Sequence, residues 1–282
     1  MRWESGRRSG NVEDRRGMTV RGGAIGGAGV LVALVLALLG APKEAIRDIL
    51  GGGSRTVTES APRPIDPAEE KAFDFVKVVL GYTEDSWNAL FAADGKRYAE
   101  PTLVVFSRAV ESACGMASAA VGPFYCPPDQ KVYLDLSFFA ELDRKFGAPG
   151  DFAQAYVVAH EVGHHVQNLL GVSQAVHQRR SRLPEEEGNR LSVMTELQAD
   201  CFAGVWAHHA NKTKQVLDPG DVEEGLQAAA AIGDDTLQRR TRGQVSPESF
   251  THGSSQQRVR WFKQGMTTGR PESCDTFNSR PL

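Results

Sequence analysis

Hydrophobic residues recur at helical spacing through most of the chain after residue 66. This pattern predicts one helix that begins at Pro67 and a long apolar helix from Asp151 to Leu170, which Gly171 would end. Further helices are predicted at residues 137–146, 191–210, 221–232 and 255–266. Strand patterns are confined to two short segments, 102–106 and 131–136. Helices that outnumber strands without alternating with them indicate a mostly helical α+β fold.

The segment between the two most apolar helices, residues 172–190, has a different pattern. It is polar and charged, with arginines at 179, 180 and 182 followed by glutamates at 185–187. Such a run of charge is typical of a solvated surface segment. We therefore predict a loop or a frayed helix here.

The N-terminal part of the chain has the pattern of a membrane anchor. Residues 22–42 form a run of 21 residues without a charge, most apolar at 30–39, and six arginines precede it. About 20 apolar residues can cross a bilayer as one helix, and the excess of arginine predicts a cytoplasmic N-terminus. The short apolar core also fits a cleaved signal peptide, but no A-x-A site follows it.

These patterns divide the chain into a cytoplasmic segment at 1–21, a transmembrane helix at 22–42, a linker rich in Gly, Ser and Pro at 43–68, and a folded domain at 69–282. The predicted localisation is a single-pass protein of the cell membrane, with the folded domain outside the cytoplasm. A hydrophobic content of 41% in 282 residues excludes a disordered chain. The net charge of -3 gives no basic surplus, so no nucleic-acid partner is expected.

The chemistry of the chain centres on His160-Glu161-Val162-Gly163-His164, an HExxH motif in the long apolar helix. Residues four apart share a helix face, so both imidazoles can bind one metal ion. Zinc prefers such nitrogen ligands in a tetrahedral site. Glu161 lies between them in the sequence and can act as the general base for a water molecule that zinc activates.

Two histidines leave a third ligand to be found. A metzincin would have Gly and His at positions that here hold Gln167 and Leu170, so that class is excluded. Glu196 and Asp200 are four residues apart in the next apolar helix, where one could bind zinc and the other hold a ligand histidine. Weaker ligand candidates are His177, His208, His209 and His252.

HExxH followed by ExxxD resembles the gluzincin arrangement of the membrane-associated heat-shock and prenyl-protein endopeptidases. This resemblance implies that Glu196 is the third zinc ligand and that Asp200 orients a ligand histidine. The same peptidases carry a T-H-P segment with an Arg six positions after the His. Thr251-His252-Gly253 and Arg258 match it except that Gly253 replaces Pro. The resemblance thus implies that His252 or Arg258 stabilises the oxyanion.

A wider likeness covers nearly the whole chain. The segments MRWESGRRSGNVEDRRG, VGPFYCPPDQKVYLDLSFF, AHEVGHHVQ, ELQADCFAGVWA and FTHGSSQQRVRWF together resemble the bacterial "putative neutral zinc metallopeptidase" family. Its members are single-span proteins with an exported catalytic domain. The resemblance implies a gluzincin-like domain behind one transmembrane helix. In gluzincins a strand before the zinc helix binds substrate; residues 131–136 could do so, although an ordinary core strand is the preferred interpretation.

Four cysteines complete the candidate chemistry. An even number in an exported domain favours disulfides. We predict the pairs Cys114–Cys126 and Cys201–Cys274; other pairings and free thiols stay open from sequence alone.

The resulting hypothesis is a membrane-anchored zinc endopeptidase with one Zn²⁺ per chain, bound by His160, His164 and Glu196. Its expected partners are a protein or peptide substrate and the membrane. One alternative is a zinc hydrolase of another amide, such as one in the cell wall. A second is a non-catalytic interaction domain stabilised by zinc. Glu161 argues against the second alternative, because a purely structural zinc site has no open position and needs no base.

Overall fold

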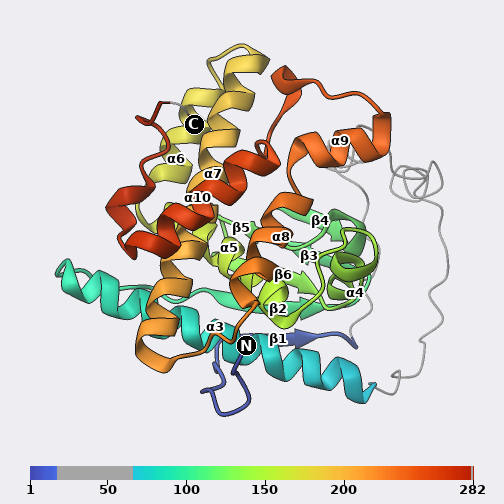
Figure 1. Ribbon diagram of the computed structural model, residues 1–282, viewed down its shortest axis with the longest axis vertical. Coiled ribbons are helices and arrows are strands. Elements are labelled where there is room, and N and C mark those ends of the chain that lie inside the picture. Colours follow the sequence, from blue (N-terminus) through green and yellow to red (C-terminus); the bar gives the residue numbers. More distant parts are fainter. Residues whose placement is uncertain (18–65, 281) are drawn as a thin grey trace.

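The computed structural model describes residues 1–17, 66–280 and 282 (Figure 1). Helices dominate this part of the chain: α3 (Pro67–Ala93), α4 (Ser137–Arg144), α5 (Asp151–Leu169), α6 (Val172–Arg180), α7 (Glu185–Lys214), α8 (Asp221–Ala231), α9 (Asp234–Arg242) and α10 (Ser255–Thr268). The strands are β1 (Val12–Arg15), β2 (Thr102–Phe106), β3 (Ala109–Ser112), β4 (Gly115–Ser118), β5 (Phe124–Cys126) and β6 (Lys131–Asp135). The mostly helical α+β class predicted from the sequence is confirmed.

The main sheet has four strands in the order β1-β2-β6-β5, and β3 and β4 form a separate hairpin. β1, β2 and β6 are parallel, whereas β5 runs antiparallel to β6. The two strands predicted from the sequence, β2 and β6, lie in the middle of the sheet and are almost wholly buried. The segment 131–136 is therefore a core strand, and β5 is the outer strand on that side.

The HExxH helix, α5, occupies the centre of the domain. It packs against α3, α7 and α8 and against strands β5 and β6 (Figure 1). Its side chains are buried on almost every face, from Phe152 to Gln167. Asp151 lies in its first turn, where a carboxylate favours the helix dipole. Because polar groups on such a helix have no access to bulk water, each needs a partner in the protein.

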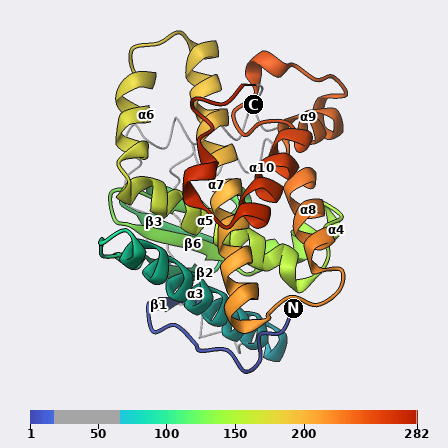
Figure 2. The ribbon, with the colours of Figure 1, turned by 60° about the vertical axis from the view of Figure 1, so that its left-hand side comes forward.

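Helices α7 and α10 approach each other more closely than side chains would allow (Figure 2). A Cβ at Gly204 would lie 2.1 Å from the carbonyl oxygen of Phe262, and one at Gly265 would lie 1.9 Å from that of Cys201. Only glycine fits at either position. This close contact brings the first turn of α10 over the middle of α7, where the candidate site lies.

Both predicted disulfides are present. Cys114–Cys126 joins the β3–β4 turn to β5, with Cα atoms 5.9 Å apart. Cys201–Cys274 joins α7 to the C-terminal segment, with Cα atoms 5.6 Å apart. The second bond therefore ties the chain after α10 to the helix that carries Glu196.

The prediction of a loop or a frayed helix at residues 172–190 is only partly right, because most of the segment is regular helix and only residues 181–184 lie between helices. These residues form α6 and the beginning of α7, which lie side by side (Figure 2). Glutamates 185–187 occupy the first turn of α7, and Arg179 and Arg180 occupy the last turn of α6. Each charge type therefore stabilises the helix end that it occupies. Because α6 has no buried residue, its sequence lacks the apolar stripe by which a helix is recognised from hydrophobic periodicity.

The N-terminal residues belong to the same folded unit as the HExxH helix. β1 pairs with β2 in parallel, with Val12 opposite Leu103. Two of the arginines that suggested a cytoplasmic segment have acidic partners: Arg8 pairs with Asp74 of α3, and Arg16 is buried against Asp14 and Glu70. Residues 1–17 and the rest of the folded domain must therefore lie on the same side of a membrane.

The predicted localisation is corrected by these findings. A transmembrane topology with a cytoplasmic N-terminus and an exported domain would separate β1 from β2, which are hydrogen-bonded neighbours. Across residues 1–17, 66–280 and 282, no helix combines the length and hydrophobicity needed to span a bilayer. The predicted anchor at 22–42 and most of the predicted linker lie outside the described residues. The single-pass arrangement, with its two parts on opposite sides of the cell membrane, is therefore wrong.

Candidate active site

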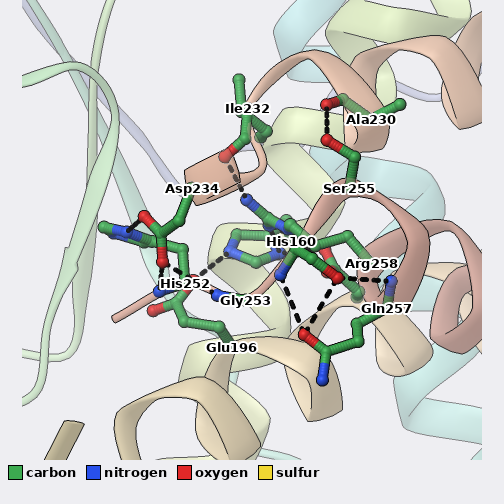
Figure 3. Close-up of polar contacts among 12 residues, drawn as sticks. His160, Glu196, Ala230, Ile232, Asp234, His252, Gly253, Ser255, Gln257 and Arg258 are labelled. Carbon is green, nitrogen blue, oxygen red and sulfur yellow. Dashed lines mark hydrogen bonds and ion pairs between the residues drawn. The ribbon is translucent and has the colours of Figure 1, made fainter. Parts of the chain in front are cut away.

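Two helices bring three candidate ligands together. His160 and His164 belong to α5, and Glu196 belongs to α7. Figure 3 shows Glu196 beside His160. His160 Nε2 lies 3.2 Å from one Glu196 oxygen, and His164 Nε2 lies 3.4 Å from the other. One ligand atom from each residue falls within 4.8 Å of the other two. The three residues that the resemblance implied as zinc ligands therefore converge.

The other nitrogen of each histidine is also bound. His160 Nδ1 lies 2.9 Å from Asp200 Oδ1, and His164 Nδ1 lies 2.9 Å from Gln167 Oε1. Gln167 is in turn fixed because its amide donates to the carbonyl oxygen of Thr195 at 2.7 Å. These contacts leave Nε2 of both rings directed toward Glu196. Metal-binding histidines are commonly oriented in this way by a partner on their second nitrogen.

Asp200 is the centre of a buried network. Arg258 of α10 donates to both of its oxygens at 2.8 Å, through Nε and Nη2. Tyr156 of α5 donates its hydroxyl at 2.5 Å. Asp200 and Tyr156 are 0% exposed and Arg258 is 2% exposed. A charge pair this deep is tolerated only when nearly every donor and acceptor has a partner.

Arg258 is not placed as the sequence resemblance suggested. Its guanidinium faces Asp200, and its Nη1 donates to the carbonyl oxygen of Ile232 at 3.3 Å (Figure 3). Because these contacts bury the group, it is not available to a substrate oxyanion. The resemblance rests on the six-residue spacing between His252 and Arg258, but this spacing alone does not tell which side of α10 carries the arginine.

The charges of the site support one another. Burial disfavours charged His160, but its hydrogen bonds to Asp200 and Glu196 outweigh this and raise the pKa of His160 to about 9. Burial would likewise raise the pKa of Glu196, yet His164 and His160 hold it well below its usual range. The ligand set thus keeps an ionised carboxylate beside two basic imidazoles. A metal ion that binds there displaces protons from the imidazoles.

The donor set fits zinc. Two imidazole nitrogens and one carboxylate oxygen form the three-ligand set of catalytic zinc sites, which keep a fourth position for water or substrate. Glu161 follows His160 on the same helix and is 8% exposed. A second group of acids, Asp151, Asp221 and Glu224, offers only carboxylates. The N-terminal ammonium of Met1 lies 2.6 Å from Asp151 and neutralises part of that group.

His252 lies beside the ligands, on the loop before α10. Its Nδ1 is 3.1 Å from Asp234 Oδ1, and its side chain is 45% exposed (Figure 3). Burial opposes the charged ring, but Asp234 and the nearby Glu196 charge outweigh this effect and raise the pKa of His252. Of the two predicted oxyanion candidates, His252 is the one whose side chain is partly exposed, since Arg258 is buried.

The remaining histidine candidates lie elsewhere. His208 and His209 of α7 contact the carbonyl oxygens of Met266 and Gly269, at 2.9 and 2.8 Å. They hold the C-terminal end of α10, and His177 lies on the exposed helix α6. None of them joins the ligand group.

Three residues of the site escaped the sequence analysis: Gln167, Tyr156 and Asp234. Gln167 could have been found, because it lies one helical turn after His164. Tyr156 likewise precedes His160 by one turn. Asp234 gave no such signal, since its partners are backbone N–H groups of a loop distant in sequence.

This candidate site has the HExxH ligand arrangement that zinc peptidases share. The chain belongs to the family described as "Putative neutral zinc metallopeptidase", whose model matches residues 1–277. It is similar to the uncharacterized protein YpfJ of Escherichia coli, with 47% identity over 98% of this chain and 99% of that protein. It is also 45% identical to the uncharacterized protein Rv2575 of Mycobacterium tuberculosis, over 74% of this chain and 73% of that protein. No solved structure matches the chain.

Proposed function

We propose that this protein is a zinc-dependent endopeptidase with one zinc ion per chain. The observation that carries the proposal is the convergence of His160, His164 and Glu196, with the second nitrogen of each imidazole already held. A site that only stabilised the fold would close its fourth position with another protein ligand. Here Glu161 stands beside the ligands instead, as a carboxylate suited to proton transfer.

The residues divide the work of peptide hydrolysis. A bound zinc ion would polarise the substrate carbonyl and lower the pKa of the attacking water. Glu161 accepts a proton from that water and later passes it to the leaving amine. His252 donates a hydrogen bond to the oxygen that becomes negative in the transition state. Asp200 and Gln167 keep the two histidine ligands oriented, and Arg258 acts through Asp200 as a positioning residue.

An extended peptide is the substrate form that suits the fold. Strand β5 is the outer strand of the main sheet and can pair with such a peptide through its backbone. Its Tyr125 hydroxyl is tied to α5 by His165 Nδ1 at 3.0 Å and by Asn168 at 3.1 Å. Because His165 directly follows the ligand His164, this strand is fixed at a constant distance from the metal ligands. A peptide on β5 would therefore be presented in one register.

The test uses the full chain, loaded with zinc, and a mixed peptide library read by mass spectrometry. The Glu161→Gln variant should retain one zinc per chain and lose activity by about 10³-fold or more, because it removes the base. Glu186→Gln, an exposed glutamate of α7, is the matched control and should cleave like the wild type. Undiminished cleavage by Glu161→Gln would refute the proposal. So would zinc binding without cleavage of any peptide, which would favour another amide substrate or a binding role.

A further inference from the structure

We propose that Asp234 is a positioning residue that makes His252 a fixed hydrogen-bond donor to the substrate. This inference rests on the proposed peptidase function and extends it to a residue outside the metal-binding helices. Asp234 begins α9, and His252 lies in the loop that precedes α10. The two segments meet at the rim of the site (Figure 3).

One carboxylate organises the whole loop. Asp234 Oδ2 accepts the backbone N–H groups of Thr251, His252 and Gly253, at 2.7, 2.6 and 3.0 Å. The backbone N–H of Asp234 donates back to the carbonyl oxygen of Gly253 at 2.8 Å. Four hydrogen bonds therefore join a single residue to three consecutive loop residues. A loop bound in this way cannot turn away from the site without losing all of them.

The second carboxylate oxygen orients the ring. Asp234 Oδ1 lies 3.1 Å from His252 Nδ1, and the Thr251 hydroxyl oxygen lies 3.0 Å from the same nitrogen. Because a carboxylate oxygen only accepts, the contact with Asp234 favours a proton on Nδ1. Nε2 is then the nitrogen that remains for a substrate oxygen. The charged groups that face the ring are Asp234 of α9, Glu196 of α7 and Arg258 of α10. The hydrogen bond to the Asp234 carboxylate favours the imidazolium form, in which Nε2 carries a proton to donate.

The glycine that replaces proline in the T-H-P pattern follows from this arrangement. Gly253 has φ of +91°, a conformation that proline cannot adopt. Its N–H also donates to Asp234, and proline has no N–H. The departure from the pattern is therefore the feature that lets one carboxylate bind three consecutive N–H groups. It identifies Asp234 as the anchor of His252 in this chain.

The neighbouring Asp235 provides a matched control. Its Oδ1 accepts the backbone N–H of Ser255 at 2.7 Å and the Ser255 hydroxyl at 2.8 Å. It thus anchors the same end of α10, but it does so without a hydrogen bond to His252. If Asp234 only held the fold, then loss of either carboxylate would have similar consequences.

The kinetic test compares Asp234→Asn with Asp235→Asn in zinc-loaded full-length protein. The amide introduced by Asp234→Asn keeps an oxygen for the backbone N–H groups but presents an N–H to His252 Nδ1, which reverses the hydrogen bond. The ring is then neutral, and its Nε2–H is a weaker donor than that of the imidazolium form. We expect kcat to fall about 10–100-fold, with KM and zinc content unchanged, because oriented partners of this kind carry such effects. Asp235→Asn should stay within about twofold. In a His252→Ala background, Asp234→Asn should cause no further loss.

A second readout does not depend on activity. Nitrogen-15 NMR of the histidine rings, with His252 assigned by its absence in His252→Ala, reports which ring nitrogen carries the proton. Wild type and Asp235→Asn should show protons on both ring nitrogens, and Asp234→Asn should lose the proton on Nδ1 and keep the one on Nε2. The inference is wrong if Asp234→Asn leaves the His252 resonances unchanged. It is also wrong if Asp234→Asn slows the His252→Ala enzyme further. The proposed peptidase function is judged separately, by Glu161→Gln.

Discussion

Two carboxylate–histidine pairs flank the candidate zinc site, and they are built in opposite ways. In the inner pair, Asp200 binds His160 in the interior, where its other partners are the side chains of Tyr156 and Arg258. In the outer pair, Asp234 binds His252 near the surface, where its other partners are backbone N–H groups of one loop. The first histidine is buried and the second is 45% exposed.

The difference separates two tasks. A metal ligand needs one fixed orientation. Side chains from α5, α7 and α10 provide it for the candidate ligand His160, at the cost of burying several charges. A donor to substrate must meet solvent and a changing ligand, so a loop is the suitable carrier. The loop keeps its shape through backbone hydrogen bonds rather than through packing. We therefore expect the first pair to dominate stability and the second to dominate turnover.

The largest effect on stability should follow Asp200→Ala. It leaves Arg258 as an unpaired buried charge, which costs about 3–5 kcal/mol. Urea unfolding of the zinc-free protein measures the change. The corresponding Asp234→Ala change should cost only about 1–3 kcal/mol, since it removes hydrogen bonds at a less buried site.

Removing both charges of the buried Asp200–Arg258 ion pair sharpens this prediction. In Asp200→Ala combined with Arg258→Met no unpaired charge remains, so part of the stability should return. If the double variant were less stable than Asp200→Ala alone, the buried charge would not be the cause of the loss.

An intermediate effect is expected at Gly253, where the outer pair can be broken from the loop side. Gly253→Pro removes an N–H bond to Asp234 and requires a negative φ, and should cost about 3 kcal/mol. Gly253→Ala should cost about 1–2 kcal/mol, because it keeps the N–H but not the ease of a positive φ. Thermal unfolding of both variants tests the order. Equal stability would show that the N–H of Gly253 contributes little.

The smallest effect is the pH dependence of the outer pair. The pKa of Asp234 is lowered, against the effect of burial, chiefly by its bond to His252, and the pKa of His252 is raised. The Asp234 contribution to stability is lost as pH falls through its folded pKa, below about 4. The His252 contribution is complete below about pH 6.5 and is lost as pH rises through its raised pKa.

The pair should therefore stabilise the fold most between about pH 4 and 6.5. The difference in Tm between wild type and His252→Gln should reach about 1–3 °C there and shrink at alkaline pH. A difference that grew with pH would contradict the assignment of an imidazolium–carboxylate pair.

Sequence patterns predicted the inner pair far better than the outer one. Helical spacing relates His160 to His164 and Glu196 to Asp200, because a regular helix turns sequence distance into geometry. Spacing could not orient Arg258, whose direction depends on how α10 crosses α7. Asp234 was out of reach because a backbone N–H is present at nearly every residue and leaves no trace in the sequence.

The same limit explains the error at the N-terminus. Six arginines before an apolar run are typical of a topological signal, but the partners of Arg8 and Arg16 on α3 are more than fifty residues away in sequence. The strand β1 is short and carries three charges, so neither its alternation nor its composition marked it. Local patterns do not contain the long-range pairing that decides where these residues lie.

The pairing of β1 with β2 also sets an order of folding. Residues 12–15 leave the ribosome early, but their partners at 103–106 are made much later. Long-range parallel pairing of this kind is slow, since the intervening chain must first be closed into a loop. A protein shortened to begin at residue 66 would fold with β2 as an exposed edge, open to association with other strands. Residues 12–15 are thus made before their partners but placed among the last, and they complete the sheet against which the HExxH helix packs.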